Sequence, residues 1–151
     1  MNIADGLRST ARAYPNKIGV IDRCAKYVPD KTTYTWGQFN ERANRLANGL
    51  ISLGLKKGDR VAIYSESRSP FATAFHAMMK AGLVLVPLNI AYKGDELVFL
   101  VNDSEPRAMF IDAELRVTAF GRSSAVTISD MKAWRAGLSN TLTKPSARAS
   151  R

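Results

Sequence analysis

The chain has 151 residues, of which 46% are hydrophobic and 23% charged, with ten glycines and six prolines. This composition is typical of a soluble globular domain and excludes a disordered or fibrous chain. Lysine and arginine number 22 against 13 aspartates and glutamates, a net charge of +9. Residues 113–151 hold seven basic and two acidic side chains, so this last quarter carries more than half of the excess.

Cys24 is the only cysteine and His76 the only histidine. No intrachain disulfide and no four-ligand zinc site of the usual kind can form from them. The first residues have neither a basic segment nor a long apolar one, so no secretory signal is expected. A reducing compartment, the cytoplasm, is therefore the expected location.

The most apolar stretch, residues 70–91, is the nearest approach to a membrane segment. Lys80 lies near its centre, and a lysine there costs about 3 kcal/mol in a bilayer. Gly82 and Pro87 also interrupt the stretch. We predict a buried helix followed by a buried strand, and no transmembrane segment.

The amino-terminal part is predicted to form a helix and two paired strands. Residues 3–14 place apolar side chains three and four positions apart, and Pro15 ends this helix. Residues 17–22 and 33–35 are predicted as short strands that pair with each other.

The clearest helix follows Thr35. Thr35 and Gln38 have the spacing of a capping box, and apolar side chains then repeat every three or four residues up to Leu50. Gly54 is predicted to end the helix in the left-handed conformation, with Leu55 folding back over it.

Three short apolar runs, residues 60–65, 83–87 and 107–112, are predicted as parallel strands. The helices between them make βαβ units. The predicted fold is therefore α/β, a partial parallel sheet of βαβ units flanked by helices.

The first intervening helix is predicted to have Ser69 as its N-cap, Pro70 in its first turn and Gly82 at its end. Its predicted buried stripe is Phe71, Phe75 and Met78.

The second intervening helix is predicted to begin at Asp95 and Glu96, which favour a helix N-terminus, and to end before Pro106. Its predicted buried face is Leu97, Leu100 and Val101. A helix-dipole role for the acidic pair is favoured over general acid–base catalysis.

Known catalytic motifs are scarce. No two glycines have the spacing that opens a G-x-G-x-x-G turn, and neither a P-loop nor a G-x-S-x-G motif occurs. Residues 54–59 are predicted to be a turn rather than a phosphate cradle, because no helix N-terminus follows them. His76, on an apolar helix, is predicted to be packed and hydrogen-bonded rather than catalytic.

The basic residues do not predict specific nucleic-acid binding. They are spread over a helix and a turn, without the interleaved aromatic side chains of a stacking platform. Weak binding of polyanions or of an anionic membrane surface by residues 139–151 remains an alternative, and it would weaken steeply with salt.

The order and spacing of several segments resemble the amino-terminal portion of the adenylate-forming acyl-CoA synthetases, over residues 3–112. The segments are Thr33–Trp36, Arg42–Ala47, Gly54–Ala62, Ala81–Asn89 and Glu96–Leu97. The resemblance implies an incomplete amino-terminal subdomain of the acyl-adenylate-forming fold. It also implies a family reaction that uses ATP, Mg²⁺ and coenzyme A to convert a carboxylic acid into its CoA thioester.

The family's catalytic segments are absent from these 151 residues. They are a Ser/Thr/Gly-rich loop ending in Pro-Lys, an aromatic-Thr-Glu segment, a ribose-binding aspartate and a lysine in a C-terminal domain. No catalytic, cofactor-binding or metal-binding residue is therefore assigned. The chain alone is expected to be inactive; the alternative is a stand-alone α/β module that binds acyl-CoA, a nucleotide or a synthetase partner.

The resemblance fades after Asp112, where the basic excess begins. Residues 1–112 are predicted to be the amino-terminal part of a synthetase domain, residues 113–138 a divergent or out-of-family continuation, and residues 139–151 a disordered basic tail. An incomplete sheet leaves an open strand edge or an apolar patch, through which the isolated chain is expected to self-associate.

Overall fold

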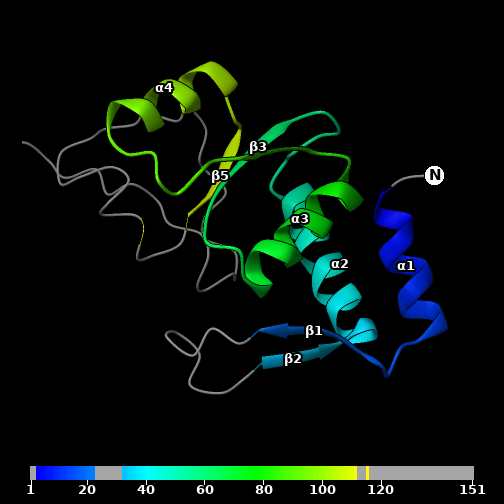
Figure 1. Cartoon of the computed structure of the whole chain (residues 1–151). Helices are drawn as coiled ribbons and strands as arrows, with labels where there is room; N and C mark the ends of the chain where they lie inside the picture. Colours follow the sequence, from blue (N-terminus) through cyan, green and yellow to red (C-terminus); the bar gives the residue numbers. More distant parts are fainter. Residues whose placement is uncertain (1–2, 23–31, 112–114, 116–151) are drawn as a thin grey trace, which may run out of the picture. The chain divides into compact units, whose positions relative to one another are not determined.

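The computed structural model describes residues 3–22, 32–111 and 115 (Figure 1). The elements, in chain order, are α1 (Ile3–Ala13), β1 (Ile18–Asp22), β2 (Thr32–Thr35), α2 (Trp36–Ser52), β3 (Arg60–Tyr64), α3 (Ser69–Ala81), β4 (Val84–Pro87), α4 (Asp95–Ser104) and β5 (Ala108–Ile111). These bounds confirm the expected elements up to β5 to within one or two residues. Cys24 and, except for residue 115, the segments 113–138 and 139–151 lie outside the described residues, so the predictions for these segments are not tested.

The chain divides into two compact units. In the described residues, the first unit contains α1, β1, β2, α2 and α3, and the second contains β3, β4, α4 and β5. No helix in these ranges is both long and apolar enough to cross a membrane.

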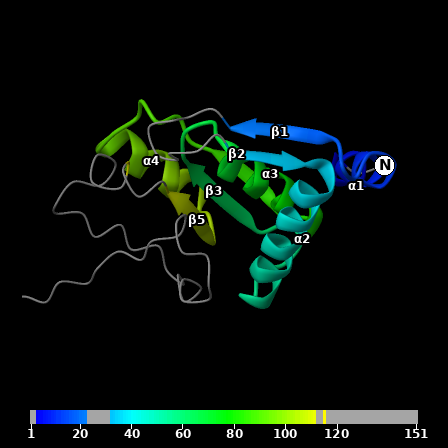
Figure 2. The same ribbon diagram turned by 90° about the horizontal axis from the view of Figure 1, so that it is seen from below.

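In the first unit, β1 and β2 form the expected antiparallel pair (Figure 2). The register shifts between Ile18 and Val20, which is the mark of a bulge. Gly19, between these two residues, lies against the indole of Trp36, where an added Cβ would be 2.4 Å from Cδ2. Val20 also faces inward, packing with the buried cluster of the first unit, while Ile18 and Ile21 are exposed.

Both ends of α2 follow the sequence prediction. The Gln38 N–H donates to Thr35 Oγ1 (3.2 Å), and the Thr35 N–H donates to Gln38 Oε1 (3.0 Å), which completes the capping box. At the other end Gly54 has a φ of +86°. Its N–H donates to the Ile51 carbonyl (2.9 Å) and the Leu55 N–H to the Leu50 carbonyl (3.3 Å), the pair of hydrogen bonds that defines a Schellman motif.

The start of α3 differs from the prediction. Arg68, not Ser69, is the N-cap, and Ser69 is the first helical residue. Its N–H (3.0 Å) and its hydroxyl (2.7 Å) both donate to Asp22 Oδ2 at the end of β1. A carboxylate distant in sequence thus satisfies the helix N-terminus, where its negative charge is also favourable.

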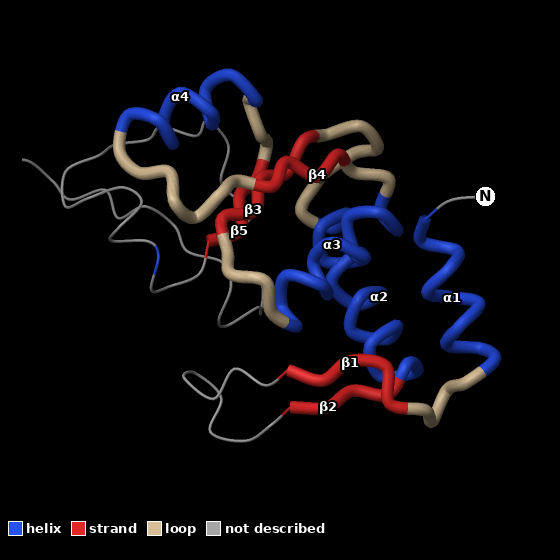
Figure 3. The backbone as a smooth tube through the Cα atoms, viewed as in Figure 1, coloured by secondary structure: helices blue, strands red, loops and turns tan. Residues whose placement is uncertain are grey.

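The prediction of which α3 side chains are buried is also partly wrong. Met78 is buried as predicted, but Phe71 and Phe75 are only partly buried. Small side chains fill the buried positions instead: Thr73, Ala74 and Ala77. The helix contacts both α1 and α2 (Figure 3). Gly82, with a φ of +71°, ends the helix as expected.

The second unit is built on a parallel sheet of strand order β4-β3-β5. Val61 of the central strand lies opposite Leu85 on one side and Ala108 on the other. The parallel strands and intervening helices confirm the predicted α/β class.

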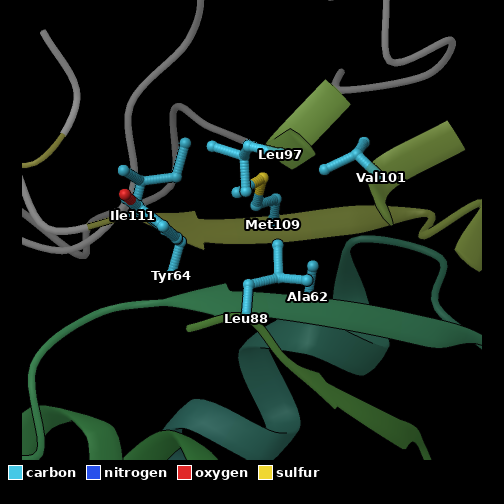
Figure 4. Packing of buried hydrophobic residues seen from close by; sticks show 7 residues of the cluster. All are labelled: Ala62, Tyr64, Leu88, Leu97, Val101, Met109 and Ile111. Carbon is cyan, nitrogen blue, oxygen red and sulfur yellow. The ribbon is translucent and has the colours of Figure 1, made fainter. Parts of the chain in front are cut away.

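One face of this sheet is covered by α4 (Figure 4). Leu97 and Val101 are buried and Leu100 packs beside them, as predicted. The buried cluster consists of Ala62, Tyr64, Leu88, Leu97, Val101, Met109 and Ile111. Asp95 and Glu96 lie in the first turn of α4, the position expected for residues that stabilise the helix dipole.

Candidate functional site

The strand order indicates a candidate site at the carboxyl ends of the strands in the second unit, which we call the carboxyl edge. In open α/β sheets, ligands bind beyond the carboxyl ends of the strands, where the strand order reverses. Here β4 lies on one side of β3 and the later β5 on the other, so the reversal falls between β3 and β5. Tyr64 and Ile111, the last residues of these strands, are register partners. Residues 112–114, which follow β5, lie outside the described residues. We therefore take the described residues at this end of the sheet, those that follow β3 and the neighbouring β4, as the candidate site.

Tyr64 organises this edge. Its side chain is fully buried, and its hydroxyl donates to the carbonyl oxygens of Ile90 (3.0 Å) and Tyr92 (2.8 Å) in a shared hydrogen bond. Burial raises the pKa of Tyr64, so the phenol stays protonated and remains a donor at neutral pH. The hydroxyl thus ties the loop after β4 to the end of β3.

The same loop is held by two further hydrogen bonds. The Leu88 N–H donates to the Ile63 carbonyl (2.8 Å), which continues the pairing of β4 with β3. Asn89 Oδ1 accepts from the Ala91 N–H (2.9 Å), an Asx turn. The loop is therefore set in shape by the chain's own contacts.

A serine hydroxyl is among the polar side chains at this edge. Ser65 follows β3, and its hydroxyl donates to the Glu66 carbonyl (3.1 Å). Nowhere in residues 3–22, 32–111 or 115 do three or more His, Cys, Asp or Glu side chains come together as a metal site would need. The described residues thus provide no cluster of three such ligands for the Mg²⁺ that the family resemblance implies.

The opposite edge holds exposed ion pairs. Arg107 Nη1 lies 3.5 Å from Asp59 Oδ2, and Arg60 Nη2 lies 3.1 Å from Glu105 Oε2. Exposed pairs of this kind contribute about 0–1 kcal/mol each. Gly58, with a φ of +90°, lies two residues before the first residue of β3. Residues 54–59 are thus a turn into a strand, as predicted.

His76 is packed, as expected, but one expected hydrogen bond is missing. Its ring makes edge contacts with Phe39 and Phe75, with centroids 5.4 and 5.2 Å apart. Nδ1 is buried and has no hydrogen-bond partner among the described residues. Desolvation lowers the pKa of His76, and the neighbouring Lys80 cation lowers it further.

Two residues that position these elements were not singled out from the sequence, namely Tyr64 and Asp22. Tyr64 carried a usable signal, because a tyrosine that ends an otherwise aliphatic buried strand must find a partner for its hydroxyl. Asp22 carried none, since its partner Ser69 lies 47 residues away.

The parallel sheet and its helices define an α/β domain. Comparison with known proteins makes the class specific. The family model described as AMP-binding enzyme matches residues 7–149, and the chain belongs to that family.

Relatives of known description agree with the resemblance inferred from the sequence. A medium/long-chain-fatty-acid–CoA/3-oxocholest-4-en-26-oate–CoA ligase of Mycolicibacterium smegmatis is 36% identical over 109 residues, which are 72% of this chain and 18% of that one. The medium-chain fatty-acid–CoA ligase of Escherichia coli is 32% identical over 109 residues, with the same coverage of 72% and 18%. The chain thus spans less than a fifth of the length of these two relatives.

Solved structures show the same fold. The N-terminal domain of FACL13 from Mycobacterium tuberculosis matches with a TM-score of 0.66 and 31% identity, over 72% of this chain and 26% of that one. A benzoate CoA ligase from Burkholderia xenovorans matches with a TM-score of 0.69 and 25% identity, over 78% and 23%. The described units therefore have the fold of the amino-terminal subdomain of adenylate-forming enzymes.

Proposed function

We propose that this chain is the amino-terminal part of an ATP-dependent acyl-CoA synthetase. The complete reaction would join a carboxylic acid to coenzyme A and convert ATP to AMP and pyrophosphate, with Mg²⁺ as the metal. The observation that carries this proposal is the match of the AMP-binding family model to residues 7–149. Relatives named for medium- and long-chain fatty acids favour a fatty acid as the substrate class.

Within such an enzyme these residues would provide scaffold rather than chemistry. One support for this proposal is that the Tyr64 hydroxyl holds the loop after β4 in place through the carbonyls of Ile90 and Tyr92. A second support is that the family's phosphate loop and C-terminal lysine domain do not occur in these 151 residues. We accordingly propose that the chain is inactive alone. We also propose that the chain consists of a synthetase part up to residue 112, a divergent continuation over residues 113–138 and a basic tail over residues 139–151. The same proposal includes a cytoplasmic location and self-association of the isolated chain.

The test is acid-dependent exchange of labelled pyrophosphate into ATP by the purified chain. Medium- and long-chain fatty acids are offered as substrates, and the E. coli medium-chain ligase serves as the active control. We expect no exchange above the enzyme-free background, because phosphoryl chemistry needs donors and a metal around the departing pyrophosphate.

Exchange that depends on the added acid would contradict the scaffold role. A folded, monodisperse chain that binds acyl-CoA or a nucleotide saturably, without exchange, would instead support the stand-alone binding module.

A further inference from the structure

A half-buried pair of basic side chains lies on α3 in the first unit and is not used by the proposed function. It contains His76 and, one helical turn later, Lys80. Lys80 Nζ donates to Asn40 Oδ1 on α2 (2.8 Å). Phe39, also on α2, presses edge-on against the His76 ring. Between α2 and α3, the His76 ring thus contacts aromatic rings, and the Lys80 ammonium is hydrogen-bonded to the neutral amide of Asn40.

The charged groups around this pair come from two helices. Lys80 lies on α3, and Arg8 and Asp5 lie on α1, where they form an ion pair of 3.5 Å. Desolvation lowers the pKa of Lys80, Arg8 lowers it further, and Asp5 partly opposes the effect. The groups that α2 presents to His76 and Lys80, Phe39 and Asn40, carry no charge. No carboxylate thus contributes to the pKa shift of His76.

We propose that His76 makes the packing of α3 against α2 acid-labile, so that the first unit loses stability when the imidazole is protonated. A neutral imidazole already leaves the buried Nδ1 without a hydrogen-bond partner, but it carries no charge. A protonated ring carries a donor on both nitrogens, so Nδ1–H would be buried without an acceptor. The new cation would also lie beside Lys80, in a site that already disfavours charge.

The direction of the pH dependence follows from linkage. Because the pKa of His76 is lowered on folding, the unfolded chain binds more protons than the folded one at pH values around and between the two pKa values. The stabilisation from neutral His76 is complete above the unfolded pKa, near 6.5, and is lost as the pH falls toward the lower folded value. Acid therefore favours unfolding of this unit.

The first test uses the fact that His76 is the only histidine. The ring C–H resonances of the tag-free chain are followed by NMR against pH, in buffer and in concentrated urea. We expect a lower titration midpoint in buffer than in urea. Equal midpoints, or a higher one in buffer, would overturn the proposal, and this measurement needs no variant.

The second test compares urea unfolding of the wild type and of His76→Gln at about pH 7.5 and about pH 5, on either side of the histidine range. The unfolding constant of the wild type should rise on acidification by a larger factor than that of the variant. Carboxylates are common to both chains, so their contributions cancel in the comparison. His76→Phe, which suits the aromatic surroundings, serves as a second non-titrating variant if the glutamine variant does not fold.

The variant Lys80→Met separates the two causes of the lowered His76 pKa, desolvation and the Lys80 cation. Removing this cation should bring the His76 midpoint partway back toward its value in urea, because desolvation remains. The proposal fails if the wild type and both His76 variants share one pH dependence.

Discussion

Replacing Leu97 with alanine is expected to lower the free energy of unfolding of the second unit by about 2–5 kcal/mol. Leu97 is 0% exposed and packs in the cluster that joins α4 to the sheet (Figure 4). Truncation removes apolar burial and leaves a cavity, since the sheet below cannot collapse onto the space. Urea unfolding followed by circular dichroism measures the loss.

Phe99→Ala on the same helix is the matched control. Phe99 is 67% exposed, so its truncation should change stability by no more than about 0.5 kcal/mol. Similar losses for the two variants would contradict the packing of α4 described above.

Gly19→Ala should destabilise the first unit by about 1–3 kcal/mol, the usual cost of overpacking. The new Cβ would lie 2.4 Å from Cδ2 and 2.7 Å from Cε2 of Trp36. These atoms belong to the middle of the indole, so the whole ring must move. Trp36 also packs against the buried cluster around Phe39, which restricts that movement. Thermal and urea unfolding measure the effect.

Gly49→Ala provides a control of opposite sign. Gly49 lies in α2 with nothing within 4 Å of an added Cβ. Alanine there should stabilise the chain by about 0.5–1 kcal/mol, because glycine loses more backbone freedom in a helix. If Gly19→Ala left stability unchanged or raised it, as Gly49→Ala should, the close approach of Trp36 to Gly19 would be refuted.

Local patterns predicted the elements well because their causes are local. The capping box of Thr35 and Gln38 and the left-handed Gly54 depend on neighbours within a few residues. Long-range contacts were missed for the complementary reason. Ser69 was predicted as the N-cap because it precedes Pro70, whereas its contact with the carboxylate of Asp22 cannot be found from spacing.

The packing of α3 shows a second limit. Periodicity finds apolar positions but not the size that each position can hold, so Phe71 and Phe75 were favoured over Thr73 and Ala74. The missing hydrogen bond of His76 has a similar origin, since its ring is surrounded by residues such as Phe39 on another helix.

Locating the candidate site required the order of the strands in the sheet, which no local sequence pattern determines. Three parallel strands were expected, but only the structure places β3 between β4 and β5 and so identifies the edge at Tyr64. The family itself was recognisable from the order of its segments, and the match to residues 7–149 confirms it.

The scaffold role is tested most directly by a chimera. The segment of this chain that aligns with the E. coli medium-chain fatty-acid–CoA ligase, 109 residues at 32% identity, replaces its counterpart in that enzyme. If this chain is the amino-terminal scaffold of an acyl-CoA synthetase, the purified chimera will form acyl-CoA from a medium-chain fatty acid, ATP and CoA. The same chimera carrying Leu97→Ala will lose activity as it loses stability. A folded, soluble chimera that forms no acyl-CoA would contradict the account.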